Sequence, residues 1–306
     1  MRVFVTGASG HIGSALVPEL LAQGHDVVGL ARSDASASKL VAAGAVVHRG
    51  DLDDLDGLRA AAAGADGVIH LAFSHETAFS GSPEGYGTAA TQELRALHAI
   101  GEALVNSGKP FVTTVGTAAL AFAKLGRPGT EEDTMPAGPR VDAENATIAL
   151  AQRSVRTSSV RLPPTVHSTL DHAGFIPSLI AMARKTGFSV YVGDGSNVWP
   201  AVHTLDVARL YRLALESAPA GTRLHGVAEE GVPFRAIAET IGKGLGLPAK
   251  SITPEEAPHH LGFLARFAGV DNPTSSTRTR ALLQWEPTHP GLLADIAEGH
   301  YLTPRS

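Results

Sequence analysis

The chain has 306 residues, of which 43% are hydrophobic, and it contains no cysteine. Disulfide bonds and thiolate catalysis are therefore excluded. The formal net charge of −5 gives no indication of a nucleic-acid or anionic-membrane partner. The length suits one large α/β domain, or a core with a small lobe. Because the sequence has no apolar run of about 18 residues and no signal-peptide pattern, we expect a cytoplasmic protein.

The start of the chain predicts a strand, a glycine-rich turn and a helix. Residues 2–6 form a short apolar run with β-branched side chains, which is typical of a buried parallel strand. Three glycines follow, and apolar residues then recur with helical spacing. In such a turn the helix N-terminus and its exposed N–H groups favour a pyrophosphate. We therefore predict dinucleotide binding, with His11 touching phosphate, by Gly7, Ser9, Gly10, His11, Ile12 and Gly13.

The glycine spacing also indicates a family. The run from Thr6 to Gly13 has the pattern Gly-x-x-Gly-x-x-Gly, unlike the Gly-x-Gly-x-x-Gly of two-domain dehydrogenases. It resembles the extended and atypical short-chain dehydrogenase/reductases, which include sugar-nucleotide epimerases and dehydratases. The resemblance implies an α/β, Rossmann-type, doubly wound and mostly parallel sheet with bound NAD or NADP. It also implies a core of residues 1–167 to which 198–227 returns, and a small substrate lobe of residues 168–197 and 228–306.

The end of the second predicted strand indicates which dinucleotide is bound. Residues 26–30 form this strand, and Ala31, Arg32 and Ser33 follow it. An acidic residue at this place binds the ribose hydroxyls of NAD, whereas an arginine accommodates the 2′-phosphate of NADP. No Asp or Glu precedes Asp34 here, and Arg32 with Ser33 offers a guanidinium and a hydroxyl. We predict NADP, with NADPH preferred over NADH; the alternative is that Arg32 is an ordinary surface residue.

Other cofactor contacts are expected where later strands end. Strands and helices alternate up to about residue 162, and right-handed crossovers make the sheet parallel. Ligands of such sheets bind beyond the carboxyl ends of the strands. In similar proteins an Asp-Leu pair after the third strand meets the adenine, and the sixth strand runs past the nicotinamide. On these grounds we assign to the cofactor Asp51, Leu52, Leu71, Ala72, Phe73, Val115, Leu162, Pro163 and Pro164.

The resemblance identifies candidate catalytic residues, with one departure from the family pattern. Typical members use a Tyr, a Lys four residues later and a Ser or Thr that binds the substrate oxygen. The hydroxyl aligns with Thr117, but Arg140 stands in the Tyr place and Glu144 in the Lys place. An arginine is not a general acid near neutral pH, yet it can polarise a carbonyl or bind a carboxylate. Glu144 is suited to ribose hydroxyls; alternatively, both residues only cap and solvate a helix N-terminus.

Without that tyrosine, another group must handle a proton. Histidine is suited to this near neutral pH, and His75 and His167 both follow strand ends. Tyr86 lies in the loop after the fourth strand, and a bound water is a further alternative. The pair His259-His260 lacks metal-ligand spacing, so we predict no metal site.

The sequence thus predicts an NADPH-dependent oxidoreductase, a carbonyl reductase acting on a small to medium organic substrate. We expect a monomer or homodimer without nucleic-acid or membrane partners. Few charged residues lie in the expected lobe contacts, which argues against a nucleotide-sugar substrate. Two alternatives remain. One is an epimerase or dehydratase that uses the cofactor transiently, and the other is a non-catalytic NADP-binding sensor, which the missing Tyr and Lys favour.

Overall fold

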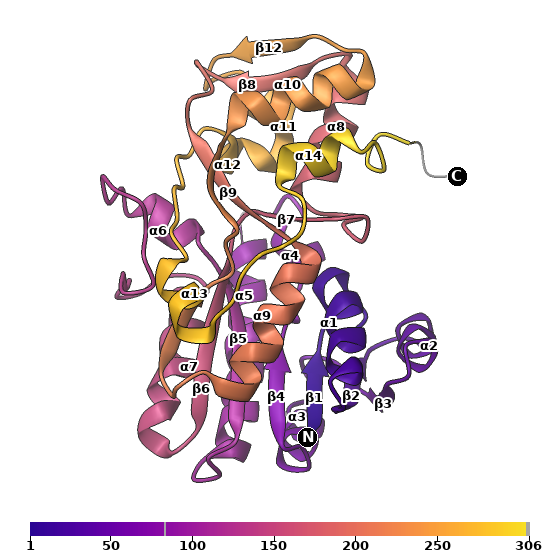
Figure 1. Cartoon of the computed structure of the whole chain (residues 1–306), viewed down its shortest axis with the longest axis vertical. Helices are drawn as coiled ribbons and strands as arrows, with labels where there is room; N and C mark the ends of the chain where they lie inside the picture. Colours follow the sequence, from indigo (N-terminus) through magenta and orange to yellow (C-terminus); the bar gives the residue numbers. More distant parts are fainter. Residues whose placement is uncertain (83, 304–306) are drawn as a thin grey trace.

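The computed structural model describes residues 1–82 and 84–303. Residue 83 and residues 304–306, which end the predicted lobe, lie outside the described residues. Figure 1 shows a large sheet with its helices in the lower part and a group of helices and short strands above it. Within the described ranges, no helix has the length and apolar character needed to cross a membrane.

The large sheet has seven strands, and all of its pairings are parallel. Their order is β10-β6-β5-β4-β1-β2-β3, so the chain reverses its direction of winding between β1 and β4. In open α/β sheets this switch point is where ligands bind. The predicted doubly wound fold is confirmed. The strands are β1 (Arg2–Thr6), β2 (Asp26–Ala31), β3 (Val46–Arg49), β4 (Gly67–His70), β5 (Pro110–Gly116), β6 (Arg156–Leu162) and β10 (Thr222–His225).

Helices cover both faces of this sheet. Leu16 and Leu20 pack with Tyr211 on one face, and Leu58 and Ile100 pack on the other. The first face carries α1 (His11–Ala22), α9 (Thr204–Ser217) and α13 (Thr277–Leu283), and the second carries α3 (Leu55–Ala63), α5 (Gly85–Leu104) and α7 (Val141–Ala149). The other helical elements of the core are α2 (Asp34–Ala42) after β2, α4 (His75–Ala78) after β4, α6 (Ala118–Phe122) after β5, and the 3₁₀ helix η1 (Leu150–Arg153), which directly follows α7.

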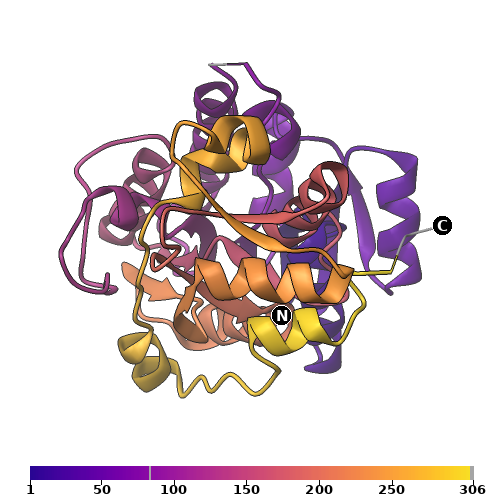
Figure 2. The same cartoon turned by 90° about the horizontal axis from the view of Figure 1, so that it is seen from above.

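A second hydrophobic cluster holds the upper part together. Trp199, Phe234 and Ile296 are almost completely buried in it. Its strands form two small sheets, β11-β9-β7 and β12-β8. These are β7 (Thr165–His167), β8 (Ser189–Val192), β9 (Val198–His203), β11 (Glu229–Pro233) and β12 (Ala249–Ile252). The helices are α8 (Phe175–Thr186), α10 (Phe234–Leu245), α11 (Ala257–Leu261), η2 (Gly262–Leu264), α12 (Ala265–Ala268) and α14 (Leu292–Ala297). Figure 2 shows α10 and α14 side by side.

The C-terminal segment is divided differently from the prediction, which places all of residues 228–306 in the lobe. Leu283 and Trp285 belong to the hydrophobic cluster of the core, and the indole of Trp285 donates to the carbonyl of Asp206 at 2.9 Å. The chain therefore leaves the upper part after α12, packs on the core through α13 and returns as α14 (Figure 1). Between residues 257 and 268 the chain forms three short helical pieces rather than one helix, because Gly262 ends α11 with a positive φ of 51°.

Candidate functional site

The glycine loop between β1 and α1 has the geometry of a phosphate site. Gly7 has φ of 68°, and a Cβ on it would lie 2.9 Å from the amide nitrogen of Ala72. A Cβ on Gly13 would lie 2.3 Å from the carbonyl oxygen of Gly7. Gly10 is exposed and caps α1 without a side-chain hydrogen bond, and the first turn holds no acidic residue. The first amides of α1 and the helix dipole are thus left for an anion, which fits a dinucleotide pyrophosphate.

The ring of His11 is held by α9. Its Nε2 atom lies 2.7 Å from the hydroxyl of Thr204, and its Nδ1 atom lies 3.9 Å from the Asp171 carboxylate. Burial, reinforced by the nearby His172, lowers the pKa of His11 to about 4. The ring is therefore neutral near pH 7 and tied to α9, so it is not a cationic phosphate ligand. The backbone of His11, in the first turn of α1, keeps its predicted place.

The end of β2 presents positive charge at the predicted adenosine position. The Arg32 guanidinium is exposed, with its Nη2 atom 3.5 Å from a Glu76 oxygen. The hydroxyl of Ser33 caps α2 by accepting from the amide of Ser36 at 3.2 Å. Arg49, at the end of the neighbouring β3, donates to the Asp34 carboxylate at 2.7 Å. Two arginines therefore flank the end of β2. Only Arg32 was predicted from the sequence as a cofactor ligand.

The remaining predicted cofactor residues lie along the same edge of the sheet. Asp51 accepts from the amides of the two residues that follow Leu52, and Leu52 itself is buried in the core. Ala72 donates its amide to the hydroxyl of Thr6 at 3.3 Å, which holds residues 71–73 beside the glycine loop. Leu162 ends β6 and Pro163 and Pro164 follow it, and Val115 is buried in β5. Their contacts with a cofactor stay predictions.

Arg140 is a fixed cation at this edge. Its Nε and Nη2 atoms donate to the two carboxylate oxygens of Glu93 at 2.9 and 2.7 Å, and Nη2 also donates to the carbonyl of Thr114 at 2.7 Å. Its guanidinium lies 4.2 Å above the ring of Phe73. Burial opposes the charged form, but the Glu93 carboxylate outweighs it and raises the pKa of Arg140. Arg140 therefore stays charged, as the sequence analysis expects of any arginine.

The backbone of Arg140 is strained. It caps α7 with φ of 63°, a left-handed conformation that costs a residue other than glycine about 1–2 kcal/mol. Its Nη1 atom makes no hydrogen bond within residues 1–82 and 84–303, and 15% of the side chain is exposed. Strained backbone that the surroundings hold in place is a feature of functional sites.

Aromatic side chains from both parts of the molecule gather beside Arg140. Phe73 contacts His75 and Tyr86, with ring centroids 5.1 and 5.9 Å apart. Phe79 continues the contact to Phe263 at 4.9 Å in the upper part. We call this group the Phe73 cluster; it consists of Phe73, His75, Phe79, Tyr86, Phe175 and Phe263. The arrangement places an apolar surface next to one fixed positive charge.

Thr117 is not presented to a substrate. Its side chain is completely buried, and its hydroxyl accepts from the Asn272 amide nitrogen at 2.9 Å. Asn272 is in turn bound by Thr274, so the hydroxyl belongs to the contact between the end of β5 and the segment after α12. This corrects the predicted role in substrate binding. Sequence reasoning could not find the contact, since Thr117 and Asn272 are 155 positions apart in the chain.

Glu144 also has a structural role. Its oxygens accept from Arg161 at 2.8 and 2.7 Å, and from Arg223 at 3.3 Å. Burial alone would raise the pKa of Glu144, but its hydrogen bonds and ion pair with Arg161 lower it. The carboxylate is thus committed to joining α7 with β6 and β10. This corrects the prediction that Glu144 binds the ribose hydroxyls.

The two predicted histidines lie in different surroundings. His167 is almost fully buried in β7, with Nδ1 2.8 Å from an Asp295 oxygen, and so it does not face a substrate. His75, at the start of α4, keeps an exposed side chain, but its ring packs against Phe73 and Phe79 of the Phe73 cluster, which removes part of its contact with water. Burial and the charge of Arg140 lower the pKa of His75, so its imidazole is neutral near pH 7. The structure therefore brings Arg140 and His75 together, but not His167.

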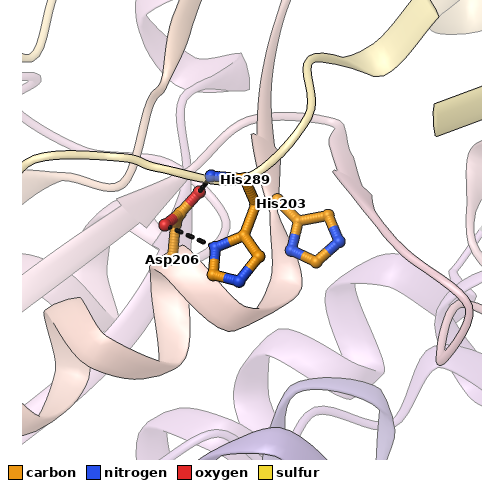
Figure 3. A group of neighbouring side chains, drawn as sticks. All are labelled: His203, Asp206 and His289. Atoms are coloured by element: carbon orange, nitrogen blue, oxygen red, sulfur yellow. Dashed lines mark hydrogen bonds and ion pairs between the residues drawn. The ribbon is translucent and has the colours of Figure 1, made fainter. Parts of the chain in front are cut away.

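Two groups in the described part have the spacing of metal ligands. One comprises His203, Asp206 and His289, and the other Asp295, Glu298 and His300. Figure 3 shows the first group, in which the two imidazoles stack 4.6 Å apart and almost parallel, at 7°. The in-plane lone pairs of parallel rings do not converge on one tetrahedral ion. Asp206 instead accepts from the ring of His289 and from the amides of residues 288 and 289, which fastens this loop to α9.

The family comparison agrees with this geometry. Residues 3–225 match the model of the NAD dependent epimerase/dehydratase family. The chain belongs to this family. The family comprises NAD-dependent epimerases and dehydratases, which supports an NAD(P)-dependent enzyme.

Individual relatives differ in how much is known of them. An uncharacterized protein of Schizosaccharomyces pombe is 48% identical over 303 residues, which cover 98% of this chain and all of the relative. The 2-alkyl-3-oxoalkanoate reductase of Stenotrophomonas maltophilia is 29% identical over 266 residues, or 81% of this chain and 77% of the reductase. The dTDP-glucose 4,6-dehydratase of Streptomyces venezuelae, solved with NAD, superposes with a TM-score of 0.76 at 20% identity, covering 98% of this chain and 96% of that one. The last likeness shows the fold.

Proposed function

We propose that the protein is an NADPH-dependent reductase of carbonyl groups in small to medium, apolar or aromatic substrates. The observation that carries this proposal is Arg140, a fixed cation with unused donors beside the Phe73 cluster, at the same sheet edge as the glycine loop. The similarity to a reductase of 2-alkyl-3-oxoalkanoates supports the same reaction class. Arg32 and Arg49, at the ends of β2 and β3, support NADPH over NADH.

In this reaction the reduced nicotinamide supplies the hydride when it is bound. The glycine loop and the first turn of α1 hold the pyrophosphate through backbone amides. The Nη1 donors of Arg140 stabilise the negative charge that develops on the substrate oxygen, and they need no reorganisation because Glu93 and Thr114 fix the guanidinium. Phe73 and Phe79 contact the apolar part of the substrate.

The test is to incubate the protein with NADPH and a panel of ketones and aldehydes. Turnover is measured as the decrease in NADPH absorbance. We expect turnover of aromatic and aliphatic carbonyl compounds by the wild type and a strong loss in Arg140→Met. Tight NADPH binding without any turnover would support the non-catalytic sensor instead. Conversion of a sugar nucleotide without net consumption of cofactor would support an epimerase or dehydratase, which the family includes.

A further inference from the structure

We propose that Tyr86 is the proton donor of the carbonyl reduction and that Arg140 stabilises the phenolate it forms. This inference rests on the proposed function. The carbonyl carbon gains a hydride from the nicotinamide, which is oxidised, and the C=O π electrons move to the oxygen. That oxygen takes the proton of the Tyr86 hydroxyl and becomes the alcohol, and solvent then reprotonates the phenolate.

The chain has four tyrosines, which lie in different surroundings. The hydroxyl of Tyr211 lies 2.7 Å from that of Thr114, deep in the core. Tyr301 is buried and donates to Asp171 at 3.2 Å. Tyr191 belongs to β8 of the upper part, where Arg235 lies over its ring. Tyr86 therefore remains as the tyrosine at the sheet edge that carries the glycine loop and Arg140.

Tyr86 lies within the Phe73 cluster, close to Arg140. It stands in the first turn of α5, half-buried, with its ring 5.9 Å from Phe73 and 6.3 Å from Phe79. Arg140 packs on the same Phe73 ring at 4.2 Å. The Tyr86 hydroxyl makes no hydrogen bond to the part of the chain that the structure describes, and it is not one of the buried polar atoms without a partner. Among those residues, the hydroxyl is therefore not committed to a structural hydrogen bond.

Tyr86 and His75 differ in whether they carry a proton to donate near neutral pH. Burial raises the pKa of Tyr86, and Arg140 opposes this only in part, so the phenol stays protonated through the neutral range. Burial and Arg140 lower the pKa of His75, so its imidazole carries no spare proton at the same pH. A developing alkoxide is a strong base and takes a proton readily from a phenol. Tyr86 is therefore the better acid of the two.

The pair also accounts for the missing family residues. In typical members a lysine close to the tyrosine favours its phenolate, but here the lysine place is occupied by Glu144, which is bound to Arg161. Arg140 supplies a permanent positive charge within electrostatic range of Tyr86. A nearby cation favours the charged form of a phenol, so it stabilises the phenolate that remains after proton transfer.

The test compares Tyr86→Phe with wild type, using NADPH with benzaldehyde and acetophenone as probes. We expect kcat/KM to fall by about 10²- to 10⁴-fold, the usual contribution of a general acid, while the Kd of NADPH is unchanged. Tyr191→Phe removes the same atom from the upper part and should match wild type. Fluorotyrosine at position 86 keeps the ring and the hydroxyl but lowers the phenol pKa. It should move the alkaline limb of the pH–rate profile to lower pH, which a merely structural tyrosine would not do.

The outcomes separate this assignment from the proposed function. A Tyr86→Phe enzyme with wild-type kcat/KM overturns the assignment and leaves the reductase standing. A wild type that binds NADPH but reduces neither probe nor the wider carbonyl panel overturns both. If Tyr86→Phe does not fold, the fluorotyrosine enzyme decides, because an unmoved alkaline limb contradicts proton donation by Tyr86.

Discussion

Arg140 and Glu93 form a buried, two-point ion pair between α7 and α5, with N–O distances of 2.9 and 2.7 Å. Glu93 is 1% exposed, so its carboxylate has exchanged water for this single partner. The pair fixes the guanidinium plane over Phe73 and leaves Nη1 for a ligand. The same residue therefore serves stability and, as we propose, catalysis, and mutations can separate the two roles.

Arg140→Met should lower both the stability of the protein and its kcat/KM. It leaves the Glu93 carboxylate buried without a partner, which should reduce the free energy of unfolding by about 3–5 kcal/mol. It also removes the donors to the substrate oxygen, so kcat/KM should fall by about 10²- to 10³-fold. Urea denaturation and NADPH oxidation kinetics measure the two effects.

The double variant Arg140→Met/Glu93→Leu is the matched control. Because both charges are removed, stability should return close to that of wild type while kcat/KM stays low. Recovery of activity together with stability would mean that Arg140 acts only through the fold.

Thr117→Val should reduce the stability of the protein rather than its activity. The substitution leaves the Asn272 amide buried without an acceptor, which should cost about 1–3 kcal/mol of unfolding free energy. Thr113→Val, in β5 just before Thr117, is the control, because the buried Thr113 hydroxyl has no partner among the described residues and its loss should be nearly neutral. Chemical denaturation distinguishes the two variants. A large fall in kcat/KM for Thr117→Val at unchanged stability would restore its predicted catalytic role.

Most of the core could be predicted because its signals are local. The apolar run of β1, the glycines after it and the helical spacing of α1 lie within about 20 residues of each other. Small strands of the upper part, such as β7 and β11, escaped prediction because each is short and pairs only with β9, which is distant in sequence. The packing of Trp285 on α9 likewise depends on a contact across 79 residues.

The candidate site was predicted in outline but not in its partners. Strand ends and family register predict Arg140 and Phe73 at one edge of the sheet, and the two side chains are in contact; their roles toward a ligand stay predictions. Neither periodicity nor register shows which acceptor a polar side chain finds. Thr117 and Glu144 were therefore assigned to ligands, whereas Asn272 and Arg161 bind them in the folded chain. The partnership of Arg140 with Glu93 had no sequence signal for the same reason.

Arg32→Ala tests the choice of cofactor. Loss of a charge-assisted contact with the 2′-phosphate should weaken NADPH binding by about 1.5–3 kcal/mol and leave NADH binding nearly unchanged. Arg49→Ala should act in the same direction, because Arg49 flanks the same strand end. Arg59→Ala, in an exposed ion pair on α3, is the control and should alter neither Kd. Equal losses for NADPH and NADH in Arg32→Ala would reject the assignment.

The last prediction concerns His70, which joins the glycine loop to the strand beside it. Its ring is fully buried, and Nδ1 lies 2.9 Å from the hydroxyl of Thr6 at the end of β1. Burial, with a contribution from the charge of Arg140, lowers the pKa of His70 to about 3. Between these two pKa values, about 6.5 in the unfolded chain and about 3 in the folded one, only the unfolded chain binds a proton at His70.

Because the unfolded state then binds more protons, His70 makes stability fall as the pH decreases from about 6.5 to about 3. The slope from one such group is at most about 1.4 kcal/mol per pH unit. Asp171 acts in the opposite sense, since burial raises its pKa to about 6 and its folded state binds the extra proton between about pH 4 and 6. The pH dependence of the whole protein is the sum of these effects, so the contribution of His70 must be measured as a difference.

Urea denaturation of wild type and His70→Asn between pH 4.5 and 7 gives that difference. The wild type should lose stability more steeply on acidification, by close to one proton's slope, and the two curves should become parallel above pH 7. His98→Asn, at an exposed position of α5, should keep the wild-type slope. Parallel curves for His70→Asn and wild type across the acidic range would show that His70 is protonated equally in both states, and that its burial against Thr6 does not keep it neutral.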